Sequence, residues 1–290
     1  MFVPLDAIAS MAAPQTRKLV GMIGSYAVIA LFAFIALYPI LYIFAISLRP
    51  GDKLLSTSLE IIPDGATLDN YRKLLTETPF LRWMLNSIFV SVVVTITGVA
   101  LASTAGYAIS RYKFSGRGAM LKGLLVTQMF PATMLLLPLY IVLINLQLLN
   151  SYVGILVIYS ATALPFCVWQ MKGYYDTIPA ALEEAARIDG CTPWQAFRLV
   201  ILPLAAPALV ITALFSFMSA WNEYVVANVV LQDVKMFTLP LGLKMFQGSM
   251  TTQWGLYAAG ALLVSIPVVA LFLGLSRYLI SGLTLGGVKG

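Results

Sequence analysis

The sequence contains no histidine and only two cysteines. Histidine is the commonest metal ligand and the commonest general base, so its absence argues against metal and acid–base chemistry. Cys167 lies on an apolar segment and Cys191 on a polar one, so the pair has neither a metal-ligand spacing nor the pattern of a disulfide framework. We therefore expect no metal site in this chain.

Charged residues are also scarce. They make up 10% of the 290 residues, and apolar residues make up 60%, whereas a soluble domain carries about 25% charged residues. A water-soluble chain could not hide so much apolar surface, so we expect lipid to surround most of the protein. The net charge of +6 does not indicate a nucleic-acid partner, because the basic residues stand in short runs beside apolar segments, as membrane orientation signals do.

Uncharged runs predict six membrane spans in one all-α domain, since a span needs about 20 mostly apolar residues. The first run, residues 19–48, is too long for the core of a signal peptide, so we expect a retained helix there. Residues 123–171 form one uncharged run of 49, which the polar stretch 148–152 divides into two helices. The predicted spans cover residues 20–47, 84–110, 123–147, 151–171, 204–229 and 254–279.

The lysines and arginines predict the orientation of these spans. With six spans both termini lie on one side, and eleven of the 18 basic residues flank that side. Four of them stand in the stretch 111–122 without an acid between them. Because cytoplasmic loops carry an excess of lysine and arginine, we expect both termini, including the segment 1–18, to lie in the cytoplasm.

The polar stretch 172–203 interrupts the spans, and its pattern is that of two helices. Residues 180–189 are mostly good helix formers, and Pro179 suits a first turn. Gly190 stands where a left-handed residue would close this helix. Thr192 and Gln195 have the spacing of a capping box, which opens a second helix.

These two helices would present a docking surface to a partner. Small residues let another backbone come close, and Glu183, Glu184 and Asp189 offer acceptors to basic groups. Trp194 and Phe197 offer an aromatic anchor. The alternative is an amphipathic helix on the bilayer surface, but such helices favour a basic polar face, so the acidic pattern favours docking.

The same stretch resembles the coupling motif of ATP-binding-cassette (ABC) importers. Their permease subunits carry the pattern E-A-A-x3-G-x9-I-x-L-P, and this chain reads E-A-A at 184–186, Gly190, and V-I-L-P at 200–203. Every spacing fits, with valine for isoleucine as the one departure. The resemblance implies an all-α, type I ABC importer permease fold with six transmembrane helices.

Four further segments, 105–117, 122–131, 192–198 and 282–290, narrow the resemblance to carbohydrate importers. They are similar to the shorter permease subunit of bacterial maltose/maltodextrin importers, and the similarity is weakest in the first outer loop. It implies transport of maltose, maltodextrins, trehalose or related oligosaccharides across the bacterial inner membrane. The implied partners are a second permease subunit, an ATPase dimer and an extracytoplasmic sugar-binding protein.

The resemblance also implies roles for residues of the coupling loop 172–203. Glu184 would contact a basic residue of the ATPase, Ala185 and Ala186 would fit a cleft on it, and Gly190 would allow the turn. The C-terminal tail is a second docking prediction, with a frayed terminus as its alternative. The tail residues concerned are Gly286, Gly287, Val288 and Lys289.

The chain lacks the phosphate-binding loop G-x-x-x-x-G-K-[ST]. ATP must therefore be hydrolysed on another subunit, and we expect neither a catalytic residue nor a cofactor here. An ion-coupled secondary transporter would show mid-membrane charges and repeated halves, and we find neither pattern. A structural membrane protein, the other alternative, would have no reason to hold the coupling motif.

Two outer regions are predicted to meet the substrate or its carrier. A carboxylate near the membrane needs a wet cavity or a partner, and sugars stack on aromatic rings. A substrate path is therefore predicted at Trp221, Asn222, Glu223 and Tyr224, the alternative being an interfacial aromatic belt. Following the same family, the outer loop 231–253 would reach the binding protein through Gly248, Thr251 and Gln253.

Overall fold

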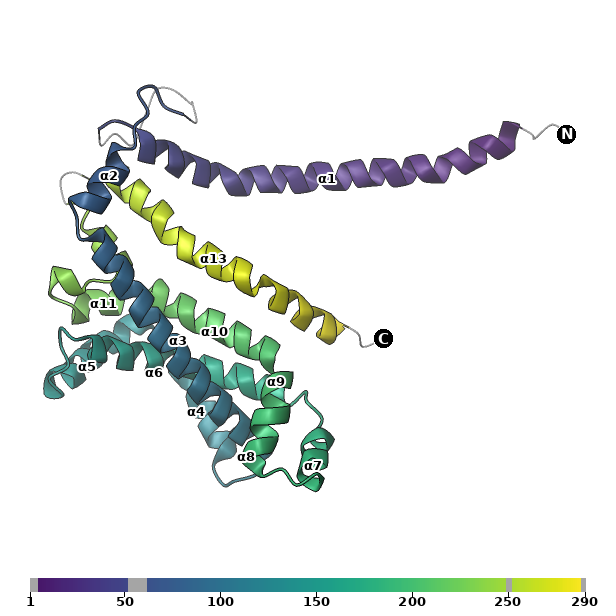
Figure 1. Ribbon diagram of the computed structural model, residues 1–290, viewed down its shortest axis with the longest axis vertical. Coiled ribbons are helices and arrows are strands. Elements are labelled where there is room, and N and C mark those ends of the chain that lie inside the picture. Colours follow the sequence, from purple (N-terminus) through teal and green to yellow (C-terminus); the bar gives the residue numbers. More distant parts are fainter. Residues whose placement is uncertain (1–4, 52–61, 249–251, 288–290) are drawn as a thin grey trace.

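The computed structural model describes residues 5–51, 62–248 and 252–287, and they form helices joined by turns (Figure 1). Among them the one strand-like feature is an isolated bridge between Gln247 and Thr252. The first helices are α1 (Leu5–Leu48), α2 (Asp69–Thr76), α3 (Phe80–Arg111), α4 (Arg117–Met129), α5 (Ala132–Asn145) and α6 (Tyr152–Tyr175). The later ones are α7 (Ala180–Ile188), α8 (Pro193–Ala196), η1 (Phe197–Ile201), α9 (Leu202–Leu204), α10 (Ala206–Trp221), α11 (Val225–Val230), η2 (Val234–Met236), α12 (Leu239–Lys244) and α13 (Trp254–Gly287).

Helix α3 forms the centre of the bundle. It packs along α6 and α10, while α13 packs on α10 and reaches α2 and α1. Figure 1 shows α3 running from α2 at one end to α4 and α8 at the other. Its buried side chains fall into three successive hydrophobic clusters, around Trp83, Val90 and Tyr107.

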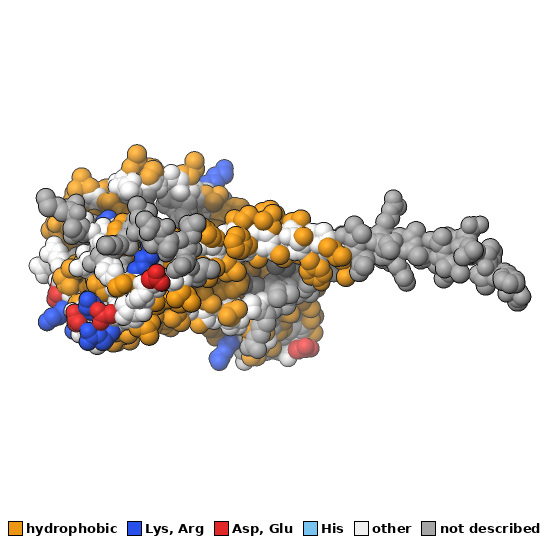
Figure 2. All heavy atoms as spheres, turned by 90° about the horizontal axis from the view of Figure 1, so that it is seen from above, with side chains coloured by type: hydrophobic (Ala, Val, Ile, Leu, Met, Phe, Trp, Pro, Cys, Tyr) orange, Lys and Arg blue, Asp and Glu red, His pale blue; other side chains and the backbone are white. Residues whose placement is uncertain are grey.

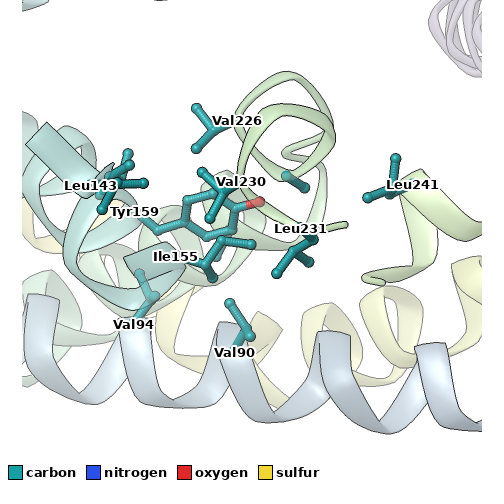
Figure 3. Close-up of a cluster of buried hydrophobic side chains, with 12 residues drawn as sticks. Val90, Val94, Leu143, Ile155, Tyr159, Val226, Val230, Leu231 and Leu241 are labelled. Carbon is teal, nitrogen blue, oxygen red and sulfur yellow. The ribbon is translucent and has the colours of Figure 1, made fainter. Parts of the chain in front are cut away.

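The middle cluster joins six helices: α3, α5, α6, α10, α11 and α12. Val90 and Val94 of α3 face Ile155 and Tyr159 of α6, and all four side chains are at most 3% exposed. Figure 3 shows side chains of α5 and α11 closing the same cluster from the opposite side. The short helix α11 is thereby held against the body of the bundle.

Four helical stretches are long and apolar enough to cross a membrane on their own: residues 21–48, 80–111, 152–175 and 254–276. Two bent pairs, each taken as one crossing, raise the number to six among the described residues. The predicted all-α architecture is therefore confirmed, and four of the crossings are single helices.

The predicted span 123–147 consists of two helices in the structure. Helices α4 and α5 meet at an angle of 106°. The break lies at Phe130, whose ψ of 128° is extended. A residue before proline is pushed out of the helical region, and Pro131 follows Phe130 directly, so the local chemistry accounts for the break.

The predicted span 204–229 is interrupted as well. The stretch 193–204 meets α10 at 78°, where Pro203 and Pro207 remove backbone donors. Helix α10 then ends at Trp221, and the side chain of Asn222 donates to the carbonyl oxygen of Met218 at 3.0 Å. The C-terminal part of this predicted span is the separate helix α11.

Helix α1 stands apart from the bundle over most of its length. Its residues from 21 to 42 are exposed on every side, and only the end around Ala45 and Ile46 is buried. Figure 2 shows hydrophobic side chains along the described part of this helix and over much of the body. Lipid or another protein chain must cover a surface of this kind.

Close contact between α3 and α6 depends on a glycine. A Cβ atom placed on Gly106 would lie 2.9 Å from Cβ of Met171 and 3.0 Å from the backbone nitrogen of Lys172. Small residues allow membrane helices to approach so closely. By contrast, a Cβ on Gly173 of α6 would meet nothing within 4 Å.

We therefore expect Gly106→Ala to destabilise the protein by about 1–3 kcal/mol, because the added methyl group forces α3 and α6 apart. Gly173→Ala is the matched control and should leave stability unchanged or slightly higher, since alanine favours helix. Thermal unfolding of the two purified variants in the same detergent measures the difference. Equal melting temperatures would contradict the tight contact.

Candidate functional site: the coupling loop

The helix α7 begins and ends where the local chemistry requires. Pro179 stands at its N-cap, and Gly190 follows its last turn with a φ of +92°. The amide of Gly190 donates to the carbonyl of Arg187 and that of Cys191 to the carbonyl of Ala186. These two bonds form a Schellman motif, so the predicted left-handed glycine closure is confirmed.

The second helical stretch opens with the predicted capping box. The amide of Gln195 donates to the Thr192 hydroxyl at 3.3 Å, and the amide of Thr192 donates to the Gln195 side chain at 2.8 Å. Helix α8 continues into the π-helical turn η1. Pro203 cannot donate to the carbonyl four residues earlier, and the wider π turn lies just before it.

Side chains of the loop divide into an outward and an inward set. Glu184 and Ala185 are exposed, and Trp194 is 61% exposed. Ala186 is buried, and Phe197 is 2% exposed within the cluster around Tyr107. The Phe197 side chain therefore lies inside the chain's own core. Of the two predicted anchor residues, Trp194 is the one that is exposed.

Polar contacts tie the loop to the end of α3. The Nε atom of Arg111 lies 3.1 Å from a carboxylate oxygen of Glu183, and Nη2 of Arg111 donates to the carbonyl of Ile178 at 2.9 Å. The Tyr107 hydroxyl donates to the other oxygen of Glu183. Glu183 was expected to offer an acceptor to a partner, and the structure instead pairs it within the chain.

A second polar tie joins α3 to the end of α6. The Ser110 hydroxyl donates to Asp176 at 2.7 Å, and Lys172 forms an ion pair with the same carboxylate. Burial raises the pKa of Asp176, but the hydrogen bonds from Lys172 and Ser110 and the nearby positive charges outweigh it and lower the pKa below its usual value. The carboxylate is therefore charged at neutral pH.

At the opposite end of the bundle, Glu223 is held within the chain. Its carboxylate accepts hydrogen bonds from the amides of Val226 and Ala227, at 2.9 and 3.1 Å, and from the Tyr159 hydroxyl at 2.7 Å. These bonds satisfy free amides at the start of α11. Figure 3 shows the Tyr159 hydroxyl among the side chains of the middle cluster.

The neighbours of Glu223 line a cavity of about 480 Å³. Trp221, Asn222 and Tyr224 form its wall at the end of α10, while α12 and α13 contribute the rest. The structure therefore brings these three residues of the predicted substrate path together around one cavity. The remaining wall residues are Pro240, Leu243, Lys244, Tyr257, Ala261 and Val264.

The loop 231–253 and the C-terminal tail are described in part. Gly248 and Gln253 are exposed, and Gln253 lines a polar cavity of about 550 Å³ beside Arg49 and Asn70. Thr251, Val288 and Lys289 lie outside the described residues. Gly286 and Gly287 form the last turn of α13.

Comparison with known proteins identifies the architecture. Residues 98–284 match the model of the family described as binding-protein-dependent transport system inner membrane component. The chain belongs to this family. It is therefore the membrane component of a transport system, which excludes the secondary-transporter and structural-protein alternatives, and it is not an enzyme.

Curated relatives of the permease span almost its whole length. It is 37% identical to the maltose/maltodextrin transport system permease protein MalG of Yersinia pestis, over 97% of each chain. It is 37% identical to the MalG protein of Escherichia coli K12, over 97% of this chain and 100% of that one. The MalG protein of Vibrio parahaemolyticus is 40% identical over 90% of this chain and 94% of its own.

Solved structures agree with this fold. A chain from a bacterial ABC transporter involved in the import of the acidic polysaccharide alginate matches 91% of the permease and 97% of its own length, with a TM-score of 0.76 and 27% identity. A chain from the alginate transporter bound to its periplasmic protein matches with a TM-score of 0.59 and 15% identity, which supports the fold alone. The predicted ABC importer permease fold is confirmed.

Sequence reasoning did not place Arg111 and Tyr107 of the permease in the coupling site. Both stand in the segment 105–117, which resembles carbohydrate importers, but that resemblance implies no role for either residue. Glu183 is 72 residues beyond Arg111 in the chain. No local spacing rule relates residues so far apart, so only the folded structure brings them together.

We expect Gly190→Ala to loosen the coupling loop. Its φ of +92° costs an alanine about 1–2 kcal/mol, although no atom lies within 4 Å of the added carbon. Amide hydrogen exchange across α7 and α8 should become about 5–30-fold faster. Gly118→Ala, which also meets nothing within 4 Å, is the control, and equal exchange in both variants would contradict the expectation.

Proposed function

We propose that this permease is a subunit of an ATP-driven importer of maltose, maltodextrins or related oligosaccharides. The proposal is supported by relatives of 37–40% identity that carry the maltose/maltodextrin name over at least 90% of this chain. A structural neighbour at 27% identity imports another saccharide polymer. Sugars delivered by an external binding protein are therefore the expected substrate class.

The observation that carries the coupling role is the division of the loop into two faces. The outward face presents Glu184, Ala185, Trp194 and the exposed Ile188, which is 87% exposed. An acid beside small and apolar side chains fits a cleft on a partner that carries a basic group. We infer that an ATPase subunit docks here, on the cytoplasmic side, with both termini on that side.

A second permease subunit is the proposed cover for α1. Its exposed side chains include Phe32 at 66% and Ile29 at 62%, and of its described side chains only those near the end that contacts α2 and α13 are buried. A heterodimer would surround α1 with helices of the other permease. The sugar would then pass between the two subunits, with the cavity beside Trp221, Asn222 and Tyr224 near its outer end.

Transport would follow from rigid-body motion of the ATPase dimer. Closure of the ATPase on ATP would displace α7, and the contacts of the loop with α3 and η1 would carry this displacement to the spans. The sugar site would thus open alternately to the two sides of the membrane. Hydrolysis would reset the ATPase, and this chain would perform no covalent chemistry.

Glu184→Lys tests the docking surface. The exposed position should tolerate the change in the membrane, but the reversed charge should repel the basic group of the ATPase and abolish co-purification of that subunit. Glu77→Lys, the same charge change at an exposed residue after α2, should retain the ATPase. Retained docking and transport by Glu184→Lys would contradict the assigned role.

A panel of sugars tests the substrate class. The complete importer, reconstituted with its binding protein, should hydrolyse ATP faster with maltose and maltodextrins than without sugar. Trehalose and an acidic oligosaccharide from alginate serve as comparison substrates. Stimulation by the acidic oligosaccharide alone would contradict the maltose assignment, and stimulation by none of the sugars would contradict the proposed function.

A further inference from the structure

Glu183 faces the bundle, although its neighbour Glu184 faces outward. Its side chain is 13% exposed, and that of its partner Arg111 is 14% exposed. The carboxylate receives Nε of Arg111 on one oxygen, at 3.1 Å, and the Tyr107 hydroxyl on the other. Both of its partners stand in the last two turns of α3, so two groups of α3 meet at one carboxylate of α7.

Arg111 holds α7 at two points. Besides Glu183 in the first turns of the helix, its guanidinium binds the carbonyl of Ile178, two residues before α7 begins, at 2.9 Å. A helix of nine residues is marginal by itself, and Ala186 is the one residue that α7 buries. With so little apolar contact, these polar bonds fix the angle between α7 and α3.

Tyr107 extends the connection to two further elements. Its ring centre lies 4.5 Å from that of Phe197 in η1 and 5.8 Å from that of Tyr175 at the end of α6. One side chain therefore contacts α7 through its hydroxyl, and η1 and α6 through its ring. A displacement of α7 must move these contacts or break them.

The Arg111–Glu183 pair differs from three local ion pairs of the described residues. Those join residues three or four positions apart in the chain, whereas this pair joins two elements and is largely shielded from water. Removing one partner of a shielded pair destabilises the protein strongly, because the other charge then stays buried without compensation. The pair is therefore suited to carry force between α7 and α3.

We propose that Glu183, Arg111 and Tyr107 form a transmission triad, in which Glu183 is a positioning residue that makes no contact with the ATPase. The triad holds the inner side of α7 to α3 while the outer side, around Glu184, docks on the partner. Motion imposed at the docking face reaches the spans through these bonds. The proposal rests on the proposed function, since it requires that the loop docks on an ATPase.

Glu183→Gln in the complete importer tests the triad. The substitution keeps the shape of the side chain and removes its charge, so Arg111 loses its ionic partner. Co-purification of the ATPase and its basal hydrolysis should remain, while sugar-stimulated hydrolysis and transport should fall about tenfold. Glu77→Gln is the matched control, with the same chemical change at an exposed residue, and should retain stimulation.

Tyr107→Phe provides a second, independent variant. It removes the hydroxyl that binds Glu183 and keeps the ring that packs on Phe197. Stimulated hydrolysis should fall in the same direction by a smaller factor, again with the ATPase bound. If Glu183→Gln fails to accumulate in the membrane, this variant decides the question by the same readouts.

Two results would overturn the triad. Stimulation within about twofold of the unmodified importer in both variants would show that the bonds transmit nothing. Loss of the ATPase from Glu183→Gln on purification would show that Glu183 is a docking contact. Failure of the proposed function is distinct, because the unmodified importer would then show no stimulation by maltose or maltodextrins.

Discussion

The need to pair every backbone donor and acceptor inside the chain governs this structure, because the hydrocarbon layer supplies no water. Long helices meet the need without help, and where α10 gives way to α11, side chains bond the free backbone groups. Asn222 bonds the carbonyl of Met218 where α10 ends, and Glu223 caps the amides that open α11. The polar residues between α10 and α11 thus first serve the backbone, and a cavity forms beside them.

The coupling loop has a different requirement. It must keep a fixed position outside the lipid, although it has almost no hydrophobic core of its own. Two kinds of contact meet this need. Phe197 enters an aromatic cluster with Tyr107 and Tyr175, and Glu183 binds the end of α3. The inner side of the loop is thereby fixed, and Glu184 and Trp194 remain free to face a partner. An exposed acid and an acid paired within the chain thus occupy adjacent residues of the same short helix.

Local features of the site could be predicted from sequence, because they depend on neighbouring residues. The left-handed turn at Gly190 and the capping box of Thr192 belong to this class. The break at Phe130 has a local cause as well, since Pro131 follows it directly, although the uncharged run there predicts one span. The inward direction of Phe197 and the pairing of Glu183 with Arg111 could not be predicted, since they depend on how distant helices pack. Composition and motif therefore indicated the fold, and packing decided which acid of the loop faces outward.

The tight contact at Gly106 has a mechanical consequence. Because Met171 and Lys172 pack so closely on that glycine, a tilt of α3 would press it against α6, and the two helices are suited to move together. Helix α3 has 32 residues, which corresponds to a length of about 48 Å. A tilt of about 10° about the end of α3 beside α4 and α8 would sweep the end beside α2 through about 8 Å. A small change of angle at one end of the helix would thus be a large displacement at the other.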